Sequence, residues 1–272
     1  MNWIQLLFTF LVPVAVIGGV GYFLLWHVLA PGVRITFQRE LGSYFYSPVA
    51  YVCLGVFAAL SSTLSFALGQ FIEQGDASLT RSFFVYHPWI FAVVAPAIGM
   101  RLWSEEHRQG TIELLTTMPI AIWHAIVGKF LAAAVVIFAA LLATVPALIT
   151  LEVLGNPDLG PALSGYLASF LMACSCLAIT SAISAFTRSQ VTAFLLAVFI
   201  SVILIFIGFP PVAHLAGKAL PGFDDFLTDL GIWDHFMEMN KGILRAGDLV
   251  YFLSIISFCL FTTAFVLRTR RA

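Results

Sequence analysis

Long apolar segments alternate with short polar breaks along this chain of 272 residues. A bilayer core about 30 Å thick needs about 20 apolar residues to be crossed by a helix. Seven segments qualify, at residues 4–29, 49–68, 83–100, 130–151, 163–186, 191–209 and 249–267, and none contains Asp, Glu, Lys or Arg. Open strands would leave backbone groups unpaired in lipid. The pattern therefore predicts an all-helical, polytopic membrane protein.

The composition supports an integral membrane protein. Hydrophobic residues make up 61% of the chain and charged residues only 10%, whereas soluble domains have about 45–50% and about 25%. The 13 basic and 14 acidic residues nearly cancel, giving a net charge of -1. Such a chain has no broad basic field, so nucleic acid is not expected as a partner.

The basic residues predict the orientation of the chain, because loops rich in Lys and Arg are retained in the cytoplasm. Counting alternate sides places nine of the thirteen on one side, namely Arg34, Arg39, Arg101, Arg108, Lys129, Arg188, Arg268, Arg270 and Arg271. Ten of the fourteen acidic residues fall on the other side. We expect a multi-pass protein of the inner (cytoplasmic) membrane. Its C-terminus and a loop at residues 101–129 would be cytoplasmic, and residues 210–248 external.

The first apolar segment, within residues 1–32, does not read as a signal peptide. Its Met-Asn-Trp start carries no positive charge and no small-residue cleavage site follows, although secretory signals have both features. We expect an extra transmembrane helix with its N-terminus outside. The alternative is a native protein that begins near Val33.

Residues 33–48 mix basic and aromatic side chains and stop at a proline. Aromatic rings favour the headgroup level of a membrane, and arginine favours water. The segment therefore predicts an amphipathic elbow helix lying along the cytoplasmic interface, and the alternative is a short basic loop. Its expected interfacial residues are Arg34, Arg39, Glu40, Tyr44, Phe45 and Pro48.

No energy source for transport is visible within the chain. Ion-driven transporters place ionisable residues inside their spans, at a cost of about 2.5–3.5 kcal/mol each, and the predicted spans have no such charge. A phosphate-binding loop needs a lysine followed by Ser or Thr, but Lys129, Lys218 and Lys241 precede Phe, Ala and Gly. We expect no cofactor in this chain and an energy supply from a partner.

Residues 101–119, with the sequence RLWSEEHRQGTIELLTTMP, form a charged island in this apolar chain. After a polar start we expect a short cytoplasmic surface helix that begins near Gly110 and Thr111. Glu113 would then lie in its first turn, where a carboxylate interacts favourably with the helix dipole. The alternative is a solvated hairpin between two spans.

The external segment carries acidic and histidine side chains that invite a metal-site or hydrolase interpretation. However, no HExxH motif is present, and Phe226, Leu227, Leu230, Trp233 and Met237 recur at helical spacing. This spacing predicts a helix on the outer leaflet, with Asp225, Asp229 and Glu238 largely on its other face. The remaining acidic and histidine residues of the cluster are Asp224, Asp234 and His235.

The cysteines and the other histidines offer no stronger site. The cysteines lie in apolar runs, where a thiol packs as a small hydrophobe, so we expect neither a disulfide nor a metal ligand. A metal pair at Cys174 and Cys176 is disfavoured because thiolates are costly in hydrocarbon and no His or carboxylate lies nearby in sequence. Interfacial positions near the membrane edges are expected for His27, His87, His124 and His214.

The charged island resembles a motif of a known family. The pattern E-E-x-x-x-G-T-x-E-L-L-x-T-x-P is similar to the signature of type-2 ABC exporter permeases of the gliding-motility GldF and NosY-like branch. It is present here as Glu105, Glu106, Gly110, Thr111, Glu113, Leu114, Leu115, Thr117 and Pro119. Residues 42–52, 187–193 and 235–252 resemble further parts of that family in the same order, so the resemblance extends from about residue 33 to the end.

The resemblance implies a six-helix permease core over residues 33–272, to which residues 1–32 add a helix that the family usually lacks. It also implies a non-catalytic transport subunit that works as a dimer with a second permease copy or a paralogue. ATP and Mg²⁺ would bind to a separate cytoplasmic ATPase, whose hydrolysis drives export or mechanical signalling. An extracytoplasmic partner would fit the signalling role.

In that family, the loop that contains the motif acts as a coupling helix docked into the ATPase. The resemblance thus implies ATPase contacts for Glu105, Glu106, His107, Arg108, Gly110, Thr111, Glu113, Leu114, Leu115 and Pro119. Two alternatives stay open. One is a membrane-embedded hydrolase that uses the external cluster around Asp234, His235 and Glu238, and the other is a membrane scaffold without transport.

Overall fold

The computed structural model describes residues 30–67, 82–111, 121–146, 149, 159–219 and 223–269, and every regular element in these ranges is helical. The expected helix at residues 4–29 lies outside the described residues. The long elements are α2 (Pro31–Tyr46), α3 (Pro48–Ala67), α6 (His87–Gly99), α9 (Ile122–Leu142), α11 (Leu159–Phe186), α12 (Gln190–Ile207) and α16 (Ala246–Thr269). Shorter elements are η1 (Phe84–Tyr86), α7 (Arg101–Gln109), α13 (Pro210–Ala219), α14 (Phe223–Leu230) and α15 (Ile232–Asn240).

Six helices in the described part are long and apolar enough to cross a membrane, which confirms the six predicted core spans. Two boundaries differ from the prediction. The span expected to end at Met100 continues as helix to Gln109, because Leu102 and Trp103 are buried and belong to the core. The next span begins at Ile122 rather than at residue 130, so Lys129 lies inside α9.

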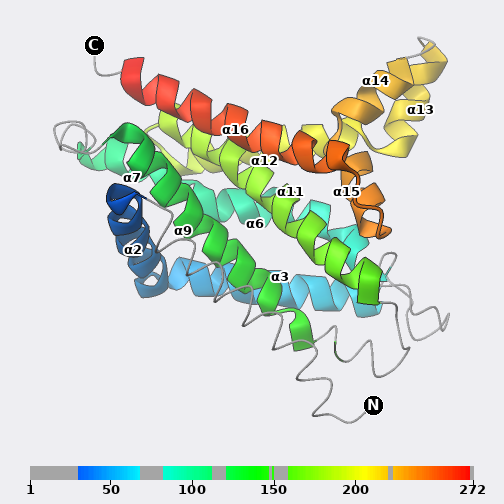
Figure 1. Ribbon diagram of the computed structural model, residues 1–272, viewed down its shortest axis with the longest axis horizontal. Coiled ribbons are helices and arrows are strands. Elements are labelled where there is room, and N and C mark those ends of the chain that lie inside the picture. Colours follow the sequence, from blue (N-terminus) through cyan, green and yellow to red (C-terminus); the bar gives the residue numbers. More distant parts are fainter. Residues whose placement is uncertain are drawn as a thin grey trace.

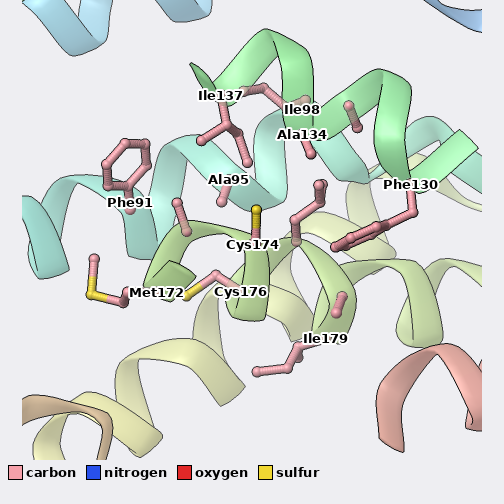
Figure 2. Packing of buried hydrophobic residues seen from close by; sticks show 14 of the residues in the cluster. Phe91, Ala95, Ile98, Phe130, Ala134, Ile137, Met172, Cys174, Cys176 and Ile179 are labelled. Carbon is pink, nitrogen blue, oxygen red and sulfur yellow. The ribbon is translucent and has the colours of Figure 1, made fainter. Parts of the chain in front are cut away.

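Helix α11 occupies the centre of the bundle and packs against α6, α9, α12 and α16. Its small residues, including Ala173, Ala178 and Ser181, are almost completely buried, which allows neighbouring helices to approach closely. Figure 2 shows Ala95 of α6 and Ala134 of α9 directed toward Cys174 of α11. This packing confirms the role predicted for the small-residue segment.

The elbow helix α2, the island helix α7 and the C-terminal end of α16 lie at one end of the molecule, whereas α13, α14 and α15 lie at the other (Figure 1). Pro31 and Pro48 each stand at a helix start, where a missing N–H and a fixed φ fit the first turn. The sequence predicted the elbow helix within two residues of both its ends. Which face of the membrane each end occupies stays a prediction.

The segment expected to form an external loop contains three short helices. A single helix was expected through residues 226–237, but Gly231 separates α14 from α15. Trp233 is buried, and α15 packs against α11 and α12 instead of lying on a leaflet. Phe226 and Leu230 are exposed on α14. The helical character predicted from the apolar spacing is therefore confirmed, but the continuity predicted across Gly231 was wrong.

Candidate functional site

The charged island is a helix whose first half is embedded in the protein. Leu102, Trp103 and Ser104 are buried, and exposure rises toward Arg108 and Gln109. Helix α7 ends at Gly110, which adopts a left-handed φ of 70° that glycine accepts without steric cost. The sequence predicted a helix that begins near this position, whereas in the structure a helix ends there. Residues 112–120 lie outside the described residues.

Three helices meet at an ammonium group that was expected at the membrane edge. Lys129 of α9 has a side chain only 5% exposed, and its Nζ lies 3.1 Å from Glu40 Oε1 of α2 and 3.0 Å from Glu106 Oε1 of α7. The same Nζ lies 5.3 Å from the centroid of the Trp103 ring, within the range of a cation–π contact. We refer to Arg39, Glu40, Glu106 and Lys129 as the charged cluster.

The charges of this cluster balance. Arg39 adds a second cation, with its Nη2 2.9 Å from Glu40 Oε1 and 3.8 Å from Glu106 Oε1. Burial would raise the pKa of Glu40, but Lys129 and Arg39 outweigh it and hold that pKa below its usual value of 4.5. A buried lysine is stable when it is paired with carboxylates in this way. The cluster is therefore a desolvated ionic contact between α2, α7 and α9.

The opposite face of α7 is bound to α11 and to the start of α12. Trp103 Nε1 donates to Ser181 Oγ at 3.1 Å, and a ring nitrogen of His107 lies 3.1 Å from the Ala185 carbonyl oxygen. The side-chain amide of Gln190, the first residue of α12, donates to Glu105. These contacts fasten the island helix to the central helix of the bundle.

The predicted coupling residues thus differ in what they offer a partner. The Glu106 carboxylate faces inward and is engaged with Lys129, so its expected external contact is corrected to an internal one. Arg108 has a side chain 65% exposed, and Gln109 and Gly110 are also exposed. Glu105 is part-buried and accepts from Arg108 at 2.6 Å, and Thr111 is part-buried. Glu113, Leu114, Leu115 and Pro119 lie outside the described residues.

The elbow residues divide between the interior and the surface. Tyr44 was expected at headgroup level, but it is 2% exposed and its hydroxyl donates to the Ile98 carbonyl oxygen at 3.0 Å. The Arg101 guanidinium lies 4.3 Å from the Tyr44 ring centroid. Phe45 is exposed, as expected. Tyr44 points inward because α2 crosses the junction of α6 and α7, which gives its ring a covered site. Of the remaining elbow residues, Arg34 is part-buried and Pro48 is exposed.

At the other end of the molecule, the acidic and histidine residues do not form one site. His235 contacts Asp248, with Nδ1 2.7 Å from Oδ1, and its Nε2 lies 3.0 Å from the Asp229 carbonyl oxygen. Glu238 instead binds Lys241 at 3.0 Å and Arg245 at 3.2 Å, and these cations lower its pKa. Both His235 nitrogens face oxygen atoms, so neither is available to activate a nucleophile. Among the described residues, no group of three or more His, Cys, Asp or Glu side chains is arranged to hold a metal.

Two buried polar residues lie deeper than the sequence predicted. His87 was expected at a membrane edge but is fully buried, 2.7 Å from Ser169 Oγ and enclosed by the rings of Phe57, Phe83, Phe84 and Phe91. Lys129 was also expected at an edge, although the preceding apolar run IWHAIVG could have continued the helix backward. A helical register that includes residues 122–128 would have identified Lys129 as an intrahelical charge, which is a signal of function in a membrane span.

Comparison with known proteins agrees with this architecture. Residues 62–269 match the family described as ABC-2 family transporter protein, a stretch that contains the island and all but part of the first of the six apolar helices. A search of curated proteins finds no significant match. The chain belongs to the ABC-2 transporter family and is a transmembrane permease subunit.

Proposed function

We propose that this chain is the permease subunit of an ATP-driven exporter of the gliding-motility GldF and NosY-like branch, and that a separate cytoplasmic ATPase contacts the exposed end of α7. The observation that carries the proposal is the polarity of this helix. Its exposed end presents Arg108 and Gln109, while Trp103 and Glu106 bind three neighbouring helices. A force applied at this end would therefore reach α2, α9 and α11 together.

The division of labour between two subunits follows from the chemistry of the chain. No lysine of the sequence stands in a phosphate-binding loop, so ATP and Mg²⁺ would bind to the partner, and this chain would perform no catalysis. The second permease copy or paralogue and the second ATPase would complete the exporter. The same lever would serve a mechanical transmitter in which an extracytoplasmic partner is moved through α13, α14 and α15.

Co-purification with a matched charge reversal tests this proposal. The tagged chain is purified from native membranes in mild detergent, and Mg²⁺-dependent ATP hydrolysis of the associated subunit is measured. Arg108→Glu should reduce both the amount of associated ATPase and the hydrolysis rate. Arg245→Glu is the control, because Arg245 is equally exposed, at 64% against 65%, but lies at the opposite end. Equal behaviour of the two variants, or an exporter without any associated ATPase, would contradict the proposal.

A further inference from the structure

The charged cluster lies across a boundary between two groups of packed helices. Helix α2 packs along α9, whereas α7 packs mainly against α11. Within the first group the contact is close, because a Cβ on Gly128 would lie 2.8 Å from the Thr36 Cβ and 2.9 Å from the Val33 carbonyl oxygen. Backbones this close leave little freedom for sliding. Helices α2 and α9 therefore form one unit that carries Glu40 and Lys129.

Helix α7 belongs to the second group through its hydrogen bonds to α11. Trp103 and His107 bind Ser181 and Ala185 on one side of α7, and Glu106 reaches Lys129 on the other. Glu106 is thus the island residue whose ion pairs cross the boundary. Near the start of α7, Tyr44 of α2 holds the Ile98 carbonyl. This buried contact gives α7 a pivot at one end and an ionic contact near the other.

The two carboxylates around Lys129 are not equally satisfied. Glu40 Oε1 accepts from Lys129 and also from Arg39 at 2.9 Å. Glu106 Oε1 contacts Lys129, but Arg39 stays 3.8 Å away, and the buried Glu106 Oε2 has no hydrogen-bond partner among the described residues. A buried acceptor without a partner costs about 1–3 kcal/mol. The Glu106 contact is therefore the weaker of the two.

Release of Glu106 would not leave a buried charge alone. If α7 moved away, Glu40 would still neutralise Lys129, and the Glu106 carboxylate would move with a helix whose end is exposed. An ion pair is costly to break chiefly when a partner is left buried and uncompensated. The arrangement of two carboxylates around one ammonium group removes that cost on the α9 side.

We propose that Glu106 is a positioning residue for transport: its ion pair with Lys129 is a releasable latch that sets the position of α7 relative to the α2–α9 unit. The latch is closed in this structure and opens when the end of α7 is displaced. The inference rests on the proposed ATPase contact at α7 for its role in transport. Its geometry, however, concerns this chain alone.

The test compares two carboxylates that contact the same ammonium group from different helices. Spin labels on Ile35 of α2 and Gln109 of α7, both exposed, report the distance between the two groups in nanodiscs. The four native cysteines are buried, so they should label poorly. Glu106→Gln should broaden or shift the distance distribution without nucleotide, and Glu40→Gln should leave it as in the wild type.

Two substitutions of Lys129 separate the ion pair from general packing. Lys129→Arg keeps the cation and should retain the wild-type distance, whereas Lys129→Met should reproduce the Glu106→Gln result. In the complex with the ATPase, Mg²⁺, ATP and vanadate should shift the wild-type distance, and this shift should be lost in Glu106→Gln. A wild-type distribution in Glu106→Gln, or equal effects of Glu40→Gln and Glu106→Gln, would overturn the latch. Because the nucleotide-free comparison needs no ATPase, its outcome is distinct from failure of the proposed function.

Discussion

Replacing Gly128 by alanine tests the rigid α2–α9 unit on which the charged cluster is built. The new Cβ would lie 2.8 Å from the Thr36 Cβ, whereas an ordinary contact begins near 3.4 Å, so the helices must separate by at least the difference of 0.6 Å. Overpacking of this kind costs about 1–3 kcal/mol. Alanine also favours a helix over glycine by about 0.5–1 kcal/mol, and this gain partly masks the cost.

Gly55→Ala in α3 isolates the packing cost, because a Cβ on Gly55 meets no atom within 4 Å. Both substitutions gain the same helix propensity, so their unfolding free energies should differ by the overpacking cost alone, about 1–3 kcal/mol. The measurement is reversible unfolding by SDS in mixed micelles, followed by tryptophan fluorescence. If Gly128→Ala unfolded at the same SDS fraction as Gly55→Ala, the two helices would not be in close contact, and the rigid unit would be refuted.

Three further predictions concern single contacts of the site and of the opposite end. Trp103→Phe and Ser181→Ala should each cost about 1 kcal/mol of unfolding free energy through the lost hydrogen bond, and the double variant should cost less than their sum in a double-mutant cycle; strict additivity would argue against the bond. The pKa of Glu40 is lowered in the folded state, so its contribution is complete above pH 4.5 and is lost as the pH falls through the lower folded-state pKa. Glu40→Gln should therefore be less stable than the wild type at pH 7 and lose less stability in acid, and parallel pH profiles would contradict this assignment. His235→Ala should cost about 2 kcal/mol because the buried Asp248 carboxylate loses a hydrogen bond, whereas Asp248→Asn should cost less, and SDS unfolding of both variants would reveal the reverse order if Asp248 were not ionised.

The spans could be predicted from the sequence because the bilayer imposes their length and composition. A helix that crosses the hydrocarbon core needs about 20 predominantly apolar residues, and the elbow helix was marked at both ends by proline. The boundary at residue 130 was wrong because a charged residue was treated as the end of a span. In the structure Lys129 is tolerated inside α9 by Glu40 and Glu106, which come from segments distant in sequence.

The site could be located from the sequence, but the direction of its side chains could not. The island was identified correctly as exceptional, and Arg108 is exposed as expected. Glu105 and Glu106 are adjacent in sequence, yet they bind opposite neighbours, because successive helix positions are separated by about 100°. Only the tertiary arrangement of α2, α9 and α12 decides which of them faces the interior. At the far end, Asp248 escaped attention because the partner of His235 comes from the following helix.

Photo-crosslinking from the end of α7 tests the proposed ATPase contact without any change to the charged cluster. A photoreactive amino acid replaces Gln109 in the native membrane, and the control position is Val250, which is exposed at the opposite end of the molecule. A docked ATPase should give an ATP-dependent crosslink from residue 109 to a subunit with a nucleotide-binding motif, and none to that subunit from residue 250. A crosslink to such a subunit from residue 250 and not from residue 109 would contradict the contact at α7.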